Sequence, residues 1–466
     1  MAIKTVVIEF DPKSLSDAIL RLEQDRVIDL VLWLIDPRTR HLVHPSTIPM
    51  TFENLMERYN QMSLANFPQE YYQEALSYLY PFINITNRWI PSTEISDYLH
   101  LFHLLLHIWH KIFKEAQAEL LLIQDAPHGP IQYMAYVMAK LMGIKVIVTE
   151  PACFTTDSFL CYSAVERIGM DYLNCDLGFE KKDIVVTMGI GKTPFYMRGK
   201  IKSTLISGRV RLMTIVKSFF SLKSCREYYK KHGSLFLYKV GEKIGYRMIE
   251  LYLTSWFRMH RNDACQAVDF QKAYVYFPLH LQPEKTTDVL GGIYEDQLLA
   301  LERLSRLIPS DWKIYVKENP KQSYYKRSEL FFLRCSYIDN VVFVPPETDT
   351  FELTRNSQFV ATINGTVGWE AITAGKKVLC FGYAWYRSLV GAIAYTENLT
   401  FDDICNYSFC QEDVSKSMEA FSKSLFPGVI SDMTNAYALN PNFSIEENNE
   451  KVYRSLKMAI LHYDDR

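Results

Sequence analysis

The segment that most constrains the fold is FVATINGTVGWEAITAGKKVLCFG, at residues 359–382. Its apolar beginning favours a buried strand, which ends at the turn signal Asn364-Gly365. Thr366 is placed to cap a following helix and Gly375 to end it, and the apolar run after that glycine predicts a second strand. A strand, a helix and a strand in this order predict two parallel strands in one sheet, and hence an α/β fold.

The turn of this unit is the first candidate binding site. Backbone N–H groups at the start of a helix, with the positive end of the helix dipole behind them, form a seat for a phosphate. Glu370, one turn into the helix, is placed to accept hydrogen bonds from a sugar hydroxyl. We therefore expect a nucleotide at Asn364, Gly365, Thr366, Val367 and Glu370. The alternative is that the glycine only makes a turn and the glutamate only faces solvent.

Composition describes an ordinary globular protein. The chain has 466 residues, 48% of them hydrophobic, and a net charge of −2, so charge gives no support to a nucleic acid partner. Nine cysteines without a CxxC pair indicate reduced thiols in the cytoplasm, with no disulfide framework and no zinc ribbon. The opening MAIKTVVIEF predicts a strand instead of a signal peptide, and no apolar run reaches the ~18 residues of a membrane span.

The first part of the chain predicts a Rossmann-like domain over residues 1–190. Strand 4–10, helix 14–24 and strand 29–35 form a βαβ unit. No GxGxxG motif follows the first strand, so we do not expect a dinucleotide there. Residues 51–115 favour helices, because they contain no long strand-like alternation.

Four histidines in this helical region recur at spacings of three and four, which places them on one helix face: His100, His103, His107 and His110. The pair His103 and His107 has the i, i+4 spacing of zinc-binding helices. Neither an HExxH motif nor a cluster of Cys or Asp accompanies the pair. A partly buried helix face is therefore the preferred interpretation, and we expect no metal.

Polar side chains follow two neighbouring predicted strands. Strand 118–124 ends at Asp125 and His128, and strand 144–149 ends at Glu150. Open parallel sheets place ligands at the carboxyl ends of their strands, so these three side chains are candidates for a catalytic acid, base or nucleophile. The alternative is that the aspartate and histidine only bond the loop backbone, as in Asx turns.

Residues 191–270 differ in composition from their surroundings. Lysines and arginines alternate there with apolar and aromatic side chains, and few acidic residues oppose them. Such a basic helical insertion suits peripheral contact with an anionic membrane, here the inner face of the cytoplasmic membrane. A solvated helical linker, or the wall of a pocket for an acidic substrate, would explain the same pattern.

A second Rossmann-like domain is predicted over residues 271–430. Its strands lead into polar loops marked by proline, which places these loops at one sheet edge. The predicted strands before the 359–382 unit are 273–279, 312–316 and 341–344. Ser444 begins a capping signal for a last helix within residues 431–466, which we expect to pack back on the first domain.

Several short segments carry a resemblance to a known family. They are QDAPHGP and TEP in the first domain, and FPLHLQPEKTT, YVKENP and TINGTVGWEAITAGKKVLCFG in the second. Together they resemble bacterial capsule polysaccharide biosynthesis proteins, which include the β-Kdo glycosyltransferases (Kdo is 3-deoxy-manno-octulosonic acid). The family's QP motif falls on Gln282-Pro283, whereas its HP motif falls on Asn319-Pro320, so the histidine is absent here.

The resemblance implies a GT-B architecture, in which two Rossmann-like domains face a central cleft and the second domain holds the donor nucleotide. It adds five residues to the expected donor site: His280, Gln282, Glu284, Lys317 and Asn319. The start of the helix after the 364–367 turn, Lys317 and His280 would stabilise the donor phosphate without a metal or cofactor.

The activity that the resemblance implies is glycosyl transfer from a nucleotide donor, favouring a CMP-activated sugar acid such as Kdo, onto a glycan or glycolipid acceptor of a surface polysaccharide. Asp125 is then the expected nucleophile or base, His128 its partner and Glu150 the acid/base. Two alternatives remain open. One is a nucleotide-sugar epimerase of the same fold, and the other is a non-catalytic glycan-binding or assembly protein.

Overall fold

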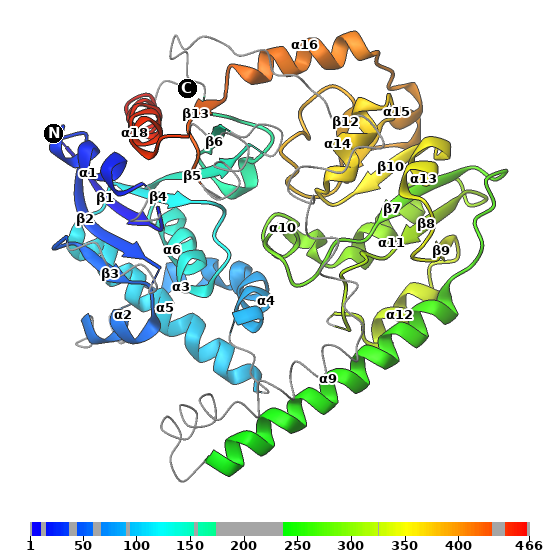
Figure 1. Ribbon diagram of the computed structural model, residues 1–466, viewed down its shortest axis with the longest axis horizontal. Coiled ribbons are helices and arrows are strands. Elements are labelled where there is room, and N and C mark those ends of the chain that lie inside the picture. Colours follow the sequence, from blue (N-terminus) through cyan, green and yellow to red (C-terminus); the bar gives the residue numbers. More distant parts are fainter. Residues whose placement is uncertain are drawn as a thin grey trace.

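The computed structural model describes residues 2–10, 15–36, 44–58, 67–89, 94–152, 157–173, 236–324, 326–430 and 443–463. These residues form two Rossmann-like α/β domains, each built around one sheet, in a GT-B-like arrangement (Figure 1). In Figure 1 the first domain lies on the left in blue and cyan, and the second on the right in green to orange.

The sheet of the first domain has seven strands in the order β13-β6-β5-β4-β1-β2-β3. The strands β1 to β5 run parallel, whereas β6 and β13 pair antiparallel at one edge. Their bounds are β1 Ile3–Ile8, β2 Ile28–Ile35, β3 Thr47–Pro49, β4 Leu120–Gln124, β5 Lys145–Pro151, β6 Ser158–Tyr162 and β13 Phe426–Pro427. The short strands β3 and β6 were not predicted, because so few residues show no clear alternation.

Helices cover both faces of this sheet, as the alternation along β1 requires. Val6 and Ile8 pack with α5 and α6 on one face, whereas Val7 packs with α1 and α18 on the other. The bounds are α1 Ser16–Gln24, α2 Phe52–Arg58, α3 Gln69–Ala75, α4 Leu79–Trp89, α5 Ile95–Ala116, α6 Pro130–Leu141 and α18 Ile445–Leu461. The predicted helical character of residues 51–115 is thus confirmed for the described part of that range.

The sheet of the second domain has six parallel strands in the order β12-β11-β10-β7-β8-β9. The predicted unit at 359–382 is present as β10, α14 and β11. The strands are β7 Tyr274–Pro278, β8 Lys313–Lys317, β9 Val341–Phe343, β10 Phe359–Thr362, β11 Val378–Cys380 and β12 Ala392–Ala394. The helices are α10 Lys285–Asp288, α11 Gln297–Leu307, α12 Glu329–Ser336, α13 Thr350–Asn356, α14 Thr366–Thr373, α15 Phe401–Asn406 and α16 Gln411–Ser422.

After α16 the chain returns to the first domain (Figure 1). β13 pairs with β6, and α18 packs against α1. Since β13 lies inside the range 271–430 but belongs to the first sheet, the second domain ends before Phe426. Ser444 caps α18 by accepting a hydrogen bond from Glu447 N at 3.3 Å.

The helix α9, Phe236–Ala264, runs along the lower edge of Figure 1 and lies in the predicted basic segment 191–270. Residues 191–235 of that segment lie outside the described residues. Large apolar side chains of α9 are exposed, namely Met248, Ile249, Leu251, Tyr252 and Met259. None of the helices in the described ranges combines the length and the hydropathy of a membrane span.

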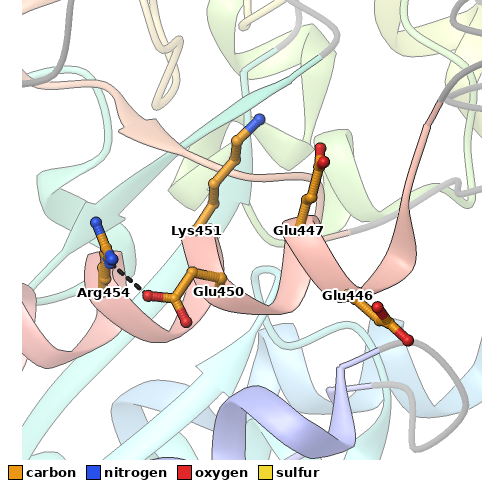
Figure 2. A pocket seen from close by; sticks show the side chains of 5 residues that line it. All are labelled: Glu446, Glu447, Glu450, Lys451 and Arg454. Atoms are coloured by element: carbon orange, nitrogen blue, oxygen red, sulfur yellow. Dashed lines mark hydrogen bonds and ion pairs between the residues drawn. The ribbon is translucent and has the colours of Figure 1, made fainter.

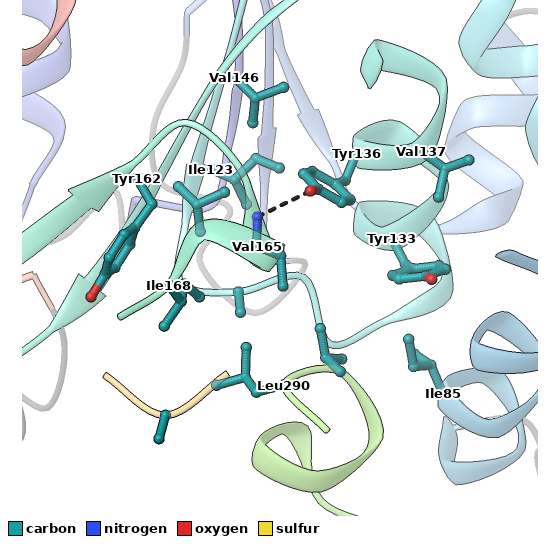
Figure 3. Packing of buried hydrophobic residues seen from close by; sticks show 14 of the residues in the cluster. Ile85, Ile123, Tyr133, Tyr136, Val137, Val146, Tyr162, Val165, Ile168 and Leu290 are labelled. Carbon is teal, nitrogen blue, oxygen red and sulfur yellow. Dashed lines mark hydrogen bonds between the residues drawn. The ribbon is translucent and has the colours of Figure 1, made fainter. Parts of the chain in front are cut away.

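Buried apolar side chains join the two domains. Leu290 of the second domain belongs to one cluster with Ile85, Val165 and Ile168 of the first (Figure 3). Nearby, Asn84 Nδ2 of α4 donates to a carboxylate oxygen of Glu295, in the short helical turn η8 (Gly292–Glu295). The facing edges of the domains are therefore in direct contact.

Candidate active site

Asp125 and Glu150 lie side by side because of the register between β4 and β5. Gln124 pairs with Thr149 in that register, so the next residue on each strand is a carboxylate. Ala126 N donates to Glu150 Oε1 at 2.6 Å, which fixes the glutamate against the loop after β4. Asp125 has a φ of 71°, in the left-handed region that Asp tolerates better than most residues. The two predicted acid–base residues thus meet at one point of the sheet edge.

Lys285 of the second domain joins this pair. It is the first residue of α10, and its ammonium lies 2.7 Å from Asp125 Oδ1 and 3.3 Å from Glu150 Oε2. The side chains are 20% exposed for Lys285, 23% for Asp125 and 14% for Glu150, so solvent screens these ion pairs less than surface pairs. Sequence reasoning missed Lys285, although it follows the QPE segment directly.

The pKa values of the two carboxyl groups differ in direction. Burial and the neighbouring charge of Asp125 raise the pKa of Glu150 to about 8, although Lys285 opposes the rise. Burial also acts to raise the pKa of Asp125, but the Lys285 ammonium and a hydrogen bond with Glu150 hold it below its usual value. At neutral pH Asp125 is ionised and Glu150 carries a proton, an arrangement that supplies a base and an acid at one place.

A third carboxylate, Glu9, follows β1 at the same edge. Its φ is 67°, and Gln132 Nε2 donates to its Oε1 at 3.0 Å. Burial raises the pKa of Glu9, although the nearby His128 and this hydrogen bond act in the opposite direction. Sequence reasoning missed Glu9 because the first strand was predicted to run through it to residue 10, whereas β1 ends at Ile8.

His128 does not take the place that we predicted for it. Its Nδ1 lies 3.2 Å from Ala126 O, and its backbone oxygen accepts from Trp89 Nε1 at 2.8 Å. The charged partner of Asp125 in this structure is Lys285, and His128 acts on the aspartate only through its electrostatic field.

The predicted binding turn begins α14 and contacts α10. Gly365 is the N-cap residue, and Thr366, which we expected to cap the helix, is its first residue. Gly365 N donates to Thr362 Oγ1 at 3.2 Å, so this N–H already has a partner. Asn364 Nδ2 donates to Thr286 O, whereas Asn364 Oδ1 is buried and has no hydrogen-bond partner within the described part of the chain.

His280 lies against this turn as a neutral imidazole. Its Nε2 is 2.9 Å from Thr362 Oγ1, and a Cβ added at Gly365 would lie 3.0 Å from the same nitrogen. Burial, together with the charge of Arg327, lowers the pKa of His280 to about 4. In this structure His280 therefore supports the turn and does not supply the positive charge that we expected.

Gln282 is only 3% exposed, and its amide is bonded within the second domain. Its Nε2 donates to Glu295 O at 2.8 Å, and its Oε1 accepts from Gln297 Nε2 at 2.7 Å and from Arg327 at 3.2 Å. Arg327 is fully buried and pairs with Glu318 at 2.7 Å. Gln282 thus shapes the loop before α10 from inside. Sequence reasoning missed Arg327 because a single loop arginine forms no pattern.

The other residues that the resemblance assigned to the donor hold their loops. Glu284 is the N-cap residue of α10. Lys317 donates to two oxygens near the start of α13, at 2.5 Å and 2.9 Å, and burial lowers its pKa. Asn319 Oδ1 accepts from Lys321 N at 2.9 Å, which is an Asx turn.

Glu370 and Val367 complete the predicted turn. Val367 is partly buried against the apolar core. Burial raises the pKa of Glu370 to about 7, so its carboxyl group lies in a poorly solvated place one turn into α14. A hydroxyl donor from a ligand would compensate the cost of such burial.

The histidine face of α5 packs on aromatic rings. His103 Nε2 lies 3.0 Å from Tyr72 OH, and both His107 and His110 contact the ring of Phe67. Burial lowers the pKa of these three histidines. The preferred interpretation as a partly buried helix face is confirmed. Over the described ranges, no three or more His, Cys, Asp or Glu side chains are grouped so as to hold a metal ion.

A surface hollow along α18 is lined by charged side chains, namely Glu446, Glu447, Glu450, Lys451 and Arg454 (Figure 2). Arg454 pairs with Glu450 of the same helix at 2.5 Å. Since α18 packs against α1, this hollow is separate from the site that Asp125, Glu150 and Lys285 form.

Comparison with known proteins gives a family match for part of the chain. Residues 213–397 match the family described as capsule polysaccharide biosynthesis protein, a range that contains Lys285 and the whole α14 turn. No curated protein matches the chain.

Two solved structures are among those that the chain is similar to, at low values. The β-Kdo 2,7 transferase KpsC of Thermosulfurimonas dismutans is 10% identical over 80% of this chain and 95% of its own, with a TM-score of 0.31. The UDP-GlcNAc 2-epimerase of Methanocaldococcus jannaschii is 13% identical over 98% of this chain and 99% of its own, with a TM-score of 0.23. At such values neither structure bears on the roles of residues in this chain.

Proposed function

We propose that this chain is a glycosyltransferase of surface polysaccharide synthesis. The premise is that residues 213–397 match the capsule polysaccharide biosynthesis family. The observation that carries the proposal is the meeting of Asp125 and Glu150 with Lys285 beside the α14 turn. An ionised and a protonated carboxyl group lie on one side, and a turn suited to a nucleotide lies on the other.

Each part of this arrangement would perform one step of glycosyl transfer. Asp125 would accept the proton of the acceptor hydroxyl as its oxygen bonds to the anomeric carbon, or would attack that carbon itself in a double displacement. Glu150, as the acid, would donate its proton to the phosphate oxygen that leaves the anomeric carbon. The positive end of the α14 dipole would stabilise the charge that the departing nucleotide phosphate gains.

The donor and the location of the enzyme are finer parts of the proposal. A CMP-activated sugar acid such as Kdo is favoured by the resemblance of the QP segment and the α14 turn, and Glu370 would accept hydrogen bonds from a sugar hydroxyl. Cytoplasmic action at the inner membrane face would suit the exposed apolar side chains of α9, such as Met248 and Tyr252.

A donor panel tests the proposal. The protein is incubated with CMP- and UDP-sugars, with and without acceptor glycans, and nucleotide release is followed. Release that depends on the acceptor supports transfer, whereas sugar interconversion without acceptor supports the epimerase alternative. No turnover of any donor, together with binding of glycans, would contradict an enzyme and favour an assembly protein.

A further inference from the structure

Lys285 connects the acid pair with the donor turn. Its ammonium pairs with Asp125 and Glu150, while the backbone oxygen of the next residue, Thr286, accepts from Asn364 Nδ2. Asn364 directly precedes the N-cap residue of α14. The lysine ammonium stands on a flexible four-carbon stem, so it can turn from the carboxylates toward a phosphate at this helix end.

We propose that Lys285 is a donor-responsive switch: the phosphate of a bound nucleotide draws its ammonium away from Asp125 and Glu150, and the carboxyl pair takes up a proton in exchange. The inference rests on the proposed function and deepens it, because it names how occupation of the donor site reaches the catalytic pair. Before donor binds, Lys285 neutralises Asp125. After donor binds, Asp125 is released as a stronger base.

The charge balance of the site supports this coupling. Two carboxylates and one ammonium leave one negative charge in excess, and the proton on Glu150 removes it. When the ammonium leaves, burial and mutual repulsion of the carboxylates remain, so their affinity for a proton rises. Of the other titratable groups that act on the pair, Glu9 strengthens this rise and His128 weakens it.

The direction and the size of the proton uptake on nucleotide binding follow from the pKa of Glu150, which is about 8. At pH 8 about half of the Glu150 groups carry a proton, and after Lys285 moves nearly all would, so binding takes up about half a proton. The phosphate of a nucleotide has its second pKa near 6 and is a dianion at pH 8, so it adds no proton change of its own.

Isothermal titration with CMP and with UDP at pH 8 measures this uptake, because the binding heat then depends on the ionisation enthalpy of the buffer. In the wild type we expect uptake of about half a proton. Lys285→Met is expected to bind nucleotide more weakly and to show no uptake. Lys326→Met is the control. Lys326 also bridges the domains, because it donates to Asn84 Oδ1 at 2.6 Å, but in the described part of the chain it forms no hydrogen bond with Asp125 or Glu150.

Glu150→Gln provides a second variant that keeps Lys285 and its pair with Asp125. It should bind nucleotide without proton uptake, and it decides the question even if Lys285→Met does not fold. Nucleotide binding without uptake in the wild type, or uptake that persists in either variant, would overturn the switch while leaving the donor site intact. If neither nucleotide produces binding heat, the donor site itself is rejected, and the switch with it.

Discussion

The edges of the two sheets that meet in this molecule differ in how their polar groups are satisfied. On the first edge Glu9, Asp125 and Glu150 are crowded together, and their charge is balanced across the domain boundary by Lys285. On the second edge the buried side chains of Gln282, Arg327 and Glu318 instead find their hydrogen-bond partners within their own domain. The carboxylates of the first edge therefore depend on the other domain for their counter-charge, whereas the buried network around Gln282 and Arg327 does not.

This difference suggests separate roles, with catalysis at the first edge and support of the binding loops at the second. Asp125 and Glu9 both have left-handed backbones, and backbone strain is often stored at functional sites. The second edge shows a network of buried hydrogen bonds, which rigidifies the loops before α10 and α14. Substitutions on the first edge should therefore alter catalysis, and substitutions on the second should alter stability or binding.

The largest effect that sharpens this contrast is expected at Asp125. Asp125→Asn keeps the size of the side chain and tolerates its left-handed backbone, but it removes the base, so kcat should fall about 10²–10⁴-fold. The dissociation constant of the nucleotide should change little. Transfer assays and nucleotide titration on the same preparation measure both, with the surface variant Asp171→Asn as control. Unchanged turnover would remove Asp125 from the mechanism.

On the second edge, Arg327→Met should act on stability. It leaves Glu318 buried without its cation, which costs about 3–5 kcal/mol of the free energy of unfolding. Arg334→Met is the matched control, because the pairs of Arg334 with Asp296 and Glu302 are 41% exposed on the arginine side and should contribute about 1 kcal/mol or less. Urea unfolding compares the two. Equal losses would show that the second edge has no special buried network.

On both sheet edges some residues could be predicted from the sequence and others could not. The α14 unit was predictable because strand, turn and helix signals are local, and Asp125 and Glu150 were predictable because each directly follows an apolar strand. Arg327 was not predictable because a single loop arginine forms no pattern. Lys285 was not predictable, since its partners Asp125 and Glu150 lie more than a hundred residues away in the sequence and only the folded domains bring them together. The antiparallel strand β13 was missed for the same reason, because its partner β6 lies in the other half of the chain.

The burial of His280 and Gln282 was not foreseen for a different reason. Sequence patterns place polar residues at a sheet edge, but they do not tell which of these residues form hydrogen bonds within the domain and which remain available to a ligand. Both are buried, and both complete hydrogen bonds inside the second domain. The imidazole loses its proton because the site is dry and Arg327 is near.

A smaller effect concerns the pH dependence of the contact between the edges. Glu295 is 1% exposed and burial raises its pKa to about 8, from an ordinary value of 4.5. The folded state therefore binds more protons than the unfolded state between these pH values. The contribution of Glu295 to the free energy of unfolding is fully present below about pH 4.5 and is lost as the pH rises to 8. The free energy of unfolding changes through this group by up to about 1.4 kcal/mol per pH unit.

Glu295→Gln tests that slope. Urea unfolding at pH 5.5 and pH 7.5 should show a smaller loss of stability in the variant than in the wild type. Part of the slope should persist, because Asp288 and Glu150 also have raised pKa values. Identical slopes would mean that Glu295 is already ionised, with Asn84 and Lys326 compensating its charge at the domain contact.

The smallest effect is expected at Glu370, and it tests whether the second edge also binds the donor nucleotide through this carboxylate. Glu370→Gln keeps an acceptor oxygen but removes the charge, so nucleotide affinity at pH 8, above the pKa of about 7, should weaken by about 1 kcal/mol, or roughly fivefold. The exposed Glu412→Gln of α16 is the control. Titration with CMP and with the matching 2′-deoxynucleotide adds a readout: if the carboxylate accepts from the ribose 2′-hydroxyl, the variant should reduce the preference for CMP. An unchanged affinity and preference would assign Glu370 to the helix surface and leave recognition to the turn before it.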